Sequence, residues 1–285
     1  MAWRRAAVVT AEWFPGLPAA HAEPVGVDTS VAHPARVYDY WLGGKDNFPA
    51  DRAAGDAAVE ANPDILPGVR ANRRFLARAV HYLAGEAGIR QFLDLGTGLP
   101  SASNTHKVAQ AEASDTRIVY VDNDPIVHAH ARALLTSTEE GATAYIDADI
   151  RDTEVILREA ARALDFSKPV AIMTLMVLQY IPDTDDPHGI VARLLAAVPS
   201  GSYLVLSDTA SDINPSATAV SAARLNQRLG PAKQTRRTRS EIERYFTGLD
   251  LIEPGLVPLN RWRPEPDDPR FPRDVPTYCG VGRKP

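Results

Sequence analysis

The chain changes its pattern of apolar and polar positions near residue 90. Beyond this point, five short runs are apolar along most of their length, as strands buried on both faces of a sheet are. They span residues 91–95, 117–121, 142–146, 169–175 and 202–207. Between them, residues 100–113, 125–135, 155–164 and 188–197 have apolar positions at helical spacing. Strands that alternate with helices predict a doubly wound α/β fold with a mostly parallel sheet.

The C-terminal segments predict two more helices and one edge of this sheet. Residues 216–229 and 240–246 have the helical pattern, whereas residues 249–258 and 277–282 predict an antiparallel pair of strands. Together with the five buried runs, these two strands give an expected sheet of seven strands, of which the C-terminal one is antiparallel.

Three helices are predicted before the first strand. Pro34 can begin a helix and Gly43-Gly44 should end it, and further helical patterns cover residues 51–61 and 67–84. Residues 1–30 are rich in Ala, Pro and Gly and show no sustained period. We therefore expect a loose tail over residues 1–30, a helical extension over residues 31–88 and one main domain over residues 89–285.

Composition narrows the class of protein. With 45% hydrophobic and 24% charged residues, the 285-residue chain should form a globular core. A net charge of −5 argues against a general nucleic-acid binder, and the chain has no apolar run of the roughly 20 residues that a membrane span needs. Cys279 is the one cysteine, which excludes an intrachain disulfide, and no histidine spacing predicts a metal site.

The N-terminus has some features of a signal peptide. Arg4-Arg5 precedes a short apolar stretch, and Ala20-His21-Ala22 resembles a cleavage site. However, Glu12 interrupts the apolar stretch and Pro15 follows it closely. We therefore expect a tail that is not cleaved and a cytoplasmic protein.

Acidic residues stand at or just past the carboxyl ends of three of the predicted strands. Asp94 stands in the turn sequence Asp94-Leu95-Gly96-Thr97-Gly98, Asp122 ends the second strand, and Asp149 follows the third. The carboxyl ends of parallel strands lie together and form the ligand-binding edge of such sheets. Glycine lets backbone approach a ligand closely, Asp122 can accept hydrogen bonds from ribose hydroxyls, and Asp149 from an adenine amino group.

Asp122 and Asp149 each have an alternative role as a helix cap. Asp122 could cap the helix that begins near Pro125, although Asn123 or Asp124 is better placed to do so. Asp149 could cap the helix that begins near Asp152.

The glycine turn does not fit a dinucleotide site well. A dinucleotide fingerprint has a third small residue, Gly or Ala, at the position where this chain has Ser101. Asp94, two residues before the first glycine, would repel a pyrophosphate, whereas it suits a ligand that carries an ammonium group and a sulfonium charge. A nucleotide-dependent oxidoreductase is therefore the weaker alternative.

These motifs resemble those of a known class of enzymes. The segments 92–98 and 119–122, together with Asp149, resemble the class I methyltransferases that depend on S-adenosylmethionine (SAM). Residues 176–183 resemble the segment that ends the fourth strand in that class. More narrowly, residues 35–47 and 120–125 resemble a bacterial S-adenosyl methyltransferase family, formerly a domain of unknown function. This narrower resemblance extends from about Ser30 to the C-terminus.

The resemblance implies a Rossmann-like class I methyltransferase fold, a helical lid over the cofactor and SAM as the cofactor. One departure is Leu99-Pro100, where many members of the class have a third glycine. The residues expected to bind the cofactor are Asp94, Gly96, Thr97, Gly98, Asp122, Asn123, Asp149, Ile150, Leu175, Tyr38 and Arg73. The candidates for binding the acceptor are Trp41, Lys45, Asp46, Gln179 and Tyr180.

The sequence does not identify the methyl acceptor, a catalytic base or the oligomeric state. We expect a small-molecule acceptor, no nucleic acid or membrane partner, and no metal. Because every motif concerns the cofactor, a non-catalytic SAM-binding sensor or partner-binding protein also fits the sequence.

Overall fold

The structure is a computed structural model that describes residues 28–99, 104–134, 137–266 and 268–285. The expected tail over residues 1–30 therefore lies almost entirely outside the described residues. So do Pro100 and Ser101, which the sequence placed in the turn and helix after the first strand.

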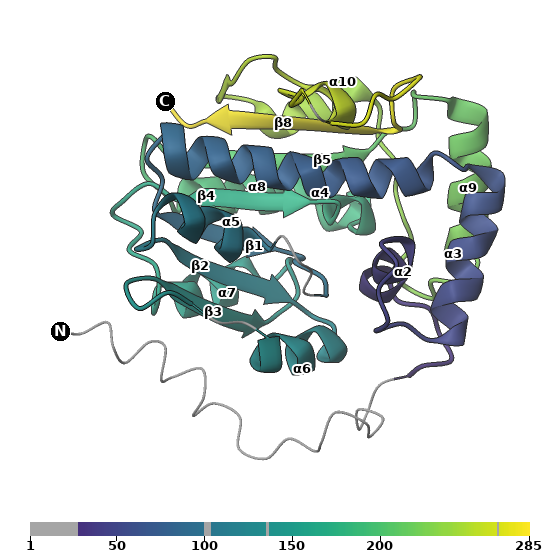
Figure 1. Cartoon of the computed structure of the whole chain (residues 1–285), viewed down its shortest axis with the longest axis horizontal. Coiled ribbons are helices and arrows are strands. Elements are labelled where there is room, and N and C mark those ends of the chain that lie inside the picture. Colours follow the sequence, from purple (N-terminus) through teal and green to yellow (C-terminus); the bar gives the residue numbers. More distant parts are fainter. Residues whose placement is uncertain (1–27, 100–103, 135–136, 267) are drawn as a thin grey trace.

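A doubly wound sheet forms the centre of the molecule (Figure 1), as the sequence pattern predicts. Its strand order is β3-β2-β1-β4-β5-β8-β6, and β7 also pairs with β8. Strands β1 to β5 are parallel, and β8 is antiparallel to its neighbours. The strands are β1 Gln91–Leu95, β2 Arg117–Asp122, β3 Ala142–Asp147, β4 Ala171–Leu175, β5 Tyr203–Thr209, β6 Asp250–Leu251, β7 Val257–Pro258 and β8 Thr277–Arg283.

The described sheet has eight strands rather than the expected seven. The predicted strand over residues 249–258 is divided into β6 and β7, which pair with different parts of β8. Pro254 has no N–H for a ladder, and Gly255 has a φ of +86°, so the chain turns between the two pieces.

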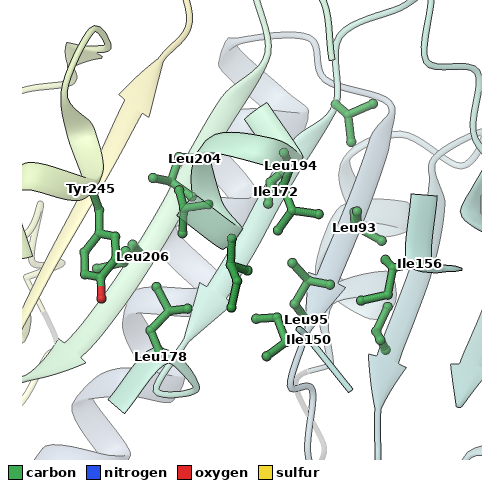
Figure 2. Packing of buried hydrophobic residues seen from close by; sticks show 14 of the residues in the cluster. Leu93, Leu95, Ile150, Ile156, Ile172, Leu178, Leu194, Leu204, Leu206 and Tyr245 are labelled. Atoms are coloured by element: carbon green, nitrogen blue, oxygen red, sulfur yellow. The ribbon is translucent and has the colours of Figure 1, made fainter. Parts of the chain in front are cut away.

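Helices cover both faces of the sheet. Leu93 and Leu95 point to the face covered by α7 and α8, and Figure 2 shows them packed with Ile156 and Leu194. Phe92 points to the opposite face, which α4 and α5 cover. The helices are α2 Pro34–Trp41, α3 Pro49–Ala61, α4 Ile65–His81, α5 Thr105–Glu112, α6 Pro125–Leu134, α7 Thr153–Ala160, α8 Pro187–Ala196, α9 Pro215–Asn226 and α10 Arg239–Glu243.

Short helical turns complete the chain. A π-helical turn, Tyr82–Glu86, extends α4, which accounts for the longer helix expected over residues 67–84. The 3-10 turns are Leu178–Tyr180, Asp183–Asp185, Arg244–Phe246 and Leu259–Arg261.

Helices α2, α3 and α9 form a cap beyond the carboxyl ends of the parallel strands (Figure 1). Val37 and Trp41 of α2, Ala54 and Ala58 of α3, and Leu225 of α9 are buried in one cluster. The sequence predicts α9 as a helix but not its place in this cap. The cap therefore combines the N-terminal extension with a segment that follows β5.

Candidate functional site

A cavity of about 650 Å³ lies between the carboxyl ends of the strands and the helical cap. This volume is within the range of sites for small molecules and cofactors. All eleven residues expected to bind the cofactor line it: Tyr38, Arg73, Asp94, Gly96, Thr97, Gly98, Asp122, Asn123, Asp149, Ile150 and Leu175. The fold thus brings together residues from segments that are far apart in the sequence.

The turn after β1 requires glycine at Gly96. Gly96 and Gly98 both have φ angles of +66°, in the left-handed region that disfavours residues with a side chain. A Cβ atom at Gly96 would also collide with Cγ2 of Val177, whereas one at Gly98 would meet nothing within 4 Å. The turn is held to the next strand because the Gly96 N–H donates to the carbonyl of Val121 at 2.8 Å. As a result, backbone rather than side chain faces this part of the cavity.

Asp122 is fixed by two backbone donors. Gly98 N–H donates to its Oδ2 at 2.8 Å, and Asp124 N–H donates to its Oδ1 at 3.0 Å. A carboxylate has about four lone-pair sites, so each oxygen can still accept from a ligand. Burial raises the pKa of Asp122, against the effect of these hydrogen bonds. A ligand that donates hydrogen bonds would relieve this cost.

Asp124, not Asp122, caps helix α6. Its Oδ1 accepts from the N–H of Ile126 at 2.8 Å. This confirms the expectation that a residue after Asp122 is better placed to cap the helix, and it leaves Asp122 facing the cavity.

Asp94 is a buried acid at the floor of the cavity. Its Oδ2 accepts from Oγ1 of Thr105 at 2.6 Å. Burial raises its pKa to about 6, and the Thr105 hydrogen bond and the positive charge of Arg73 oppose that rise. Arg73, on α4, therefore lies near enough to Asp94 for the two charges to interact, and both line the cavity. The site can hold a ligand end that carries both an ammonium and a carboxylate group.

Asp149 and Asn123 lie together on the β2–β3 side of the cavity. Asn123 Nδ2 donates to Asp149 Oδ2 at 3.2 Å. Asp149 also accepts from the N–H and the guanidinium of Arg151, at 2.9 and 2.8 Å. The N-cap of α7 is Asp152, so capping does not account for Asp149.

The cap is tied to the strand edge by residues that the sequence analysis missed. His33 Nδ1 lies 2.8 Å from Oδ2 of Asp124, and Arg36 Nε lies 3.8 Å from the same oxygen. The backbone N–H of His33 also donates to Asp51 at 2.9 Å. His33 and Arg36 both line the cavity. Arg36 stands in the segment 35–47 that carries the family resemblance, but no pattern predicts these contacts, because they depend on how α2 packs against the turn after β2.

Only one of the five candidates for binding the acceptor lines the cavity. Tyr180 lines the cavity, whereas the other four do not. Trp41 is buried in the cap and its indole N–H donates to Gly55, so packing accounts for it. Lys45 is exposed, and the Asp46 N–H donates to Asp39 within the loop after α2.

Gln179 lies behind the cavity wall rather than in it. Its side chain is 1% exposed, and its backbone carbonyl accepts from Thr235. The part of the wall that the sequence analysis missed comes from the segment after α9, with Leu229, Pro231 and Ala232. This segment returns over the cavity in a way that no periodicity predicts.

Among residues 28–99, 104–134, 137–266 and 268–285, no cluster of three or more His, Cys, Asp or Glu residues could hold a metal ion. Within these ranges, no helix is both long enough and apolar enough to cross a membrane.

Comparison with known proteins decides the family. A family model described as S-adenosyl methyltransferase matches residues 20–285. The chain belongs to the S-adenosyl methyltransferase family. Its members depend on SAM, so this chain is a SAM-dependent methyltransferase. The oxidoreductase alternative is thereby set aside.

Two solved structures support this assignment to the S-adenosyl methyltransferase family. A DUF574 family protein from Streptomyces avermitilis is 45% identical, with a TM-score of 0.88 over 90% of this chain and 99% of that one. A protein from Thermobifida fusca, named for an inferred methyltransferase activity, is 42% identical, with a TM-score of 0.84 over 93% and 99% of the two chains. No curated protein shows significant similarity to the chain.

A more distant structure shows the shared fold. The plantazolicin methyltransferase BpumL, solved with S-adenosylhomocysteine (SAH) and a triazolic desmethylPZN analogue, is 12% identical. Its TM-score is 0.54 over 88% of this chain and 96% of that one. The sheet described above is therefore that of the class I methyltransferases.

Proposed function

We propose that this methyltransferase binds SAM in the cavity below the helical cap and transfers the methyl group to a small-molecule acceptor. The observation that carries the proposal is the convergence of Asp94, Asp122 and the Gly96–Gly98 turn on one cavity. Their chemistry fits the cofactor: two buried acids face a ligand that is cationic at one end and carries ribose hydroxyls in the middle.

The nucleoside end of SAM would lie along β2 and β3. Asp122, already oriented by Gly98 and Asp124, has lone pairs left to accept from both ribose hydroxyls. Asn123, Asp149 and Ile150 would surround the adenine, with Asp149 accepting from its amino group. Arg151 donates to both carboxylate oxygens of Asp149, and the remaining lone pairs of these oxygens would accept from the adenine amino group.

The amino-acid end would lie between β1, β4 and α4. Asp94 would accept from the ammonium group, Arg73 would bind the carboxylate, and Leu175 and Tyr38 would flank them. When bound, SAM supplies a methyl group on a sulfonium, which is already activated for displacement. The protein's contribution is to position the acceptor in line and to exclude water, which the cap over the cavity suits.

The size and enclosure of the site favour a small acceptor. The cavity of about 650 Å³ must hold both the cofactor and the acceptor, and residues of α2 and of the segment that follows α9 line it. A large macromolecular substrate would need to displace this cap. We also propose a cytoplasmic location, which suits a chain whose one thiol, Cys279, is free and buried.

The test uses SAM with a radiolabelled methyl group and a bacterial extract separated by ultrafiltration into small molecules and macromolecules. We expect the protein to transfer label into the small-molecule fraction, and the Asp122→Asn variant to transfer far less. Transfer into the macromolecular fraction alone would contradict the small-molecule acceptor. Binding of SAM without transfer to any fraction would favour the non-catalytic sensor.

A further inference from the structure

One wall of the cavity is formed by uncharged side chains. Val177, Tyr180 and Ile181, which follow β4, line the cavity, and so do Leu229 and Ala232 of the segment after α9. Together these five residues form the cap wall. Tyr180 packs against the apolar cluster of the helical cap, to which Leu229 belongs. The cap wall is therefore a continuous surface built by two segments that are far apart in the sequence.

The cap wall continues onto the residues just before α2. Ala32 lines the cavity and is buried in the same cluster as Leu229. The segment after α9 packs closely here, because a Cβ atom on Gly230 would lie 3.1 Å from Cγ1 of Val31. This side of the cavity is thus closed by aliphatic groups from both ends of the cap.

Tyr180 contributes its ring rather than its hydroxyl to the cap wall. Its hydroxyl oxygen accepts from Nε2 of Gln234 at 3.1 Å, and Gln234 is not among the residues that line the cavity. The hydroxyl is therefore directed into the protein. An aromatic ring that faces a cavity offers a large apolar surface, on which another ring can stack.

Several charged residues that line the cavity are paired with one another. His33 Nδ1 and Arg36 Nε lie 2.8 and 3.8 Å from Oδ2 of Asp124. Arg151 pairs with Asp149 at 2.8 Å. These pairs lie on the β2–β3 side of the cavity, where the nucleoside end of the cofactor is proposed to bind.

The other charged residues of the lining also have a place elsewhere. Arg73, Asp94 and Asp122 stand at proposed cofactor positions. Asp28 accepts from the N–H and the hydroxyl of Ser30, at 2.9 and 2.6 Å. A charged group of the acceptor against the cap wall would lose its hydration without gaining a counter-ion, which is costly. The cap wall therefore favours an uncharged ligand group.

The cap wall adjoins the proposed cofactor site. A Cβ atom on Gly96 would collide with Cγ2 of Val177, so Val177 lies directly against the glycine turn. Leu175, at the end of β4, is itself a proposed cofactor position and lines the same cavity. A molecule seated on the cap wall would therefore lie beside the bound cofactor.

We propose that the cap wall is the acceptor subsite and that the methyl acceptor presents an uncharged aromatic ring to it. The ring packs against Tyr180 and against the aliphatic groups of Val177, Leu229 and Ala232, as the apolar part of a ligand does in most small-molecule sites. The inference rests on the proposed function, because it names the substrate class of the same cavity.

The test measures binding of three naphthalene probes to protein saturated with SAH, which fills the cofactor site without a methyl group to transfer. Naphthamide is uncharged, naphthoate is its anionic isostere, and naphthylmethylamine is a cation. Ligand-observed NMR at pH 7 compares the wild type with Ala232→Asp, which adds a carboxylate to the cap wall, and with Tyr180→Leu, which removes the ring. Ala223→Asp is the matched control, because Ala223 is exposed on α9 and the change in charge is equal.

We expect naphthamide to bind the wild type and Ala223→Asp at least tenfold more tightly than naphthoate does. Ala232→Asp should lose at least tenfold in naphthamide affinity and gain affinity for naphthylmethylamine, and Tyr180→Leu should lose several-fold for naphthamide. Both variants should keep the wild-type affinity for SAH.

Naphthoate binding as tightly as naphthamide, no binding of naphthamide, or unchanged naphthamide binding by Ala232→Asp would overturn the inference. Failure of SAH itself to bind the wild type would instead contradict the proposed function.

Discussion

The backbone N–H of Gly98 donates a hydrogen bond of 2.8 Å to Oδ2 of Asp122. This bond joins the turn after β1 to the acid that ends β2, although 24 residues separate them. Because Asp124 holds the other carboxylate oxygen, the position of Asp122 is set before any ligand arrives. Such preorganisation reduces the conformational entropy that the protein loses when a cofactor binds.

Asp122→Asn should weaken SAM binding by roughly 1.5–3 kcal/mol, the range for hydrogen bonds to a charged group. The amide keeps the shape of the side chain but loses the charge and one acceptor. Titration calorimetry with SAM measures the effect. Asp250→Asn is the control, because Asp250 is exposed on the edge strand β6. An unchanged SAM affinity of the Asp122→Asn variant would contradict the role of Asp122 in binding the ribose hydroxyls.

Alanine at the two glycines should have unequal effects. Both have φ angles of +66°, so each substitution costs about 1–2 kcal/mol in backbone strain. Only Gly96→Ala adds a collision with Val177, so it should lower the melting temperature and the SAM affinity much more than Gly98→Ala.

The double variant Gly96→Ala/Val177→Ala checks the cause of this difference. Removing the valine methyl groups should recover part of the lost melting temperature. No recovery would mean that the collision with Val177 does not explain the cost.

SAM binding should strengthen as pH rises from 5 to 7. The free protein holds Asp94 with a pKa of about 6, and a bound ammonium group would lower that value. Binding then releases a proton below about pH 6, so affinity rises with pH and levels off above pH 7. Calorimetry over this range tests the effect, with Asp94→Asn as the variant that should give a nearly flat profile. A flat profile in the wild type would show that Asp94 does not face the cation.

Asp94→Asn should also stabilise the protein without cofactor. Its folded pKa of about 6 lies above the ordinary value of 3.8, so the free energy of unfolding falls as pH rises from 4 to 6. The variant avoids this loss and keeps the hydrogen bond from Thr105. At pH 8 it should gain up to about 3 kcal/mol, since one pKa unit corresponds to about 1.4 kcal/mol. Urea unfolding at pH 4 and pH 8 measures the gain, and a destabilised variant at pH 8 would contradict it.

The sequence predicts the parallel sheet and the meeting of Asp94, Asp122 and Asp149 at one cavity, because both depend on local patterns. The strands of the parallel part are mostly apolar runs, and Asp94, Asp122 and Asp149 stand at or just past the carboxyl ends of β1, β2 and β3. The antiparallel pairing of the C-terminal segments also follows from the pattern, although the chain turns at Pro254 and Gly255 and divides one of them into β6 and β7.

What the sequence does not predict depends on long-range packing. His33 meets Asp124 only because α2 folds back over the turn after β2, and the segment after α9 reaches the cavity only through the packing of α9 on α3. Trp41 belongs to a conspicuous aromatic segment, but its burial in the cap makes it a packing residue.

The most direct test of the central claim is titration calorimetry of the purified protein with SAM, SAH and NAD. The buried acids Asp94 and Asp122 and the glycine turn predict saturable binding of SAM and SAH at one site, and no binding of NAD. Binding of NAD alone, or of none of the three, would contradict the account of the cavity as a SAM site.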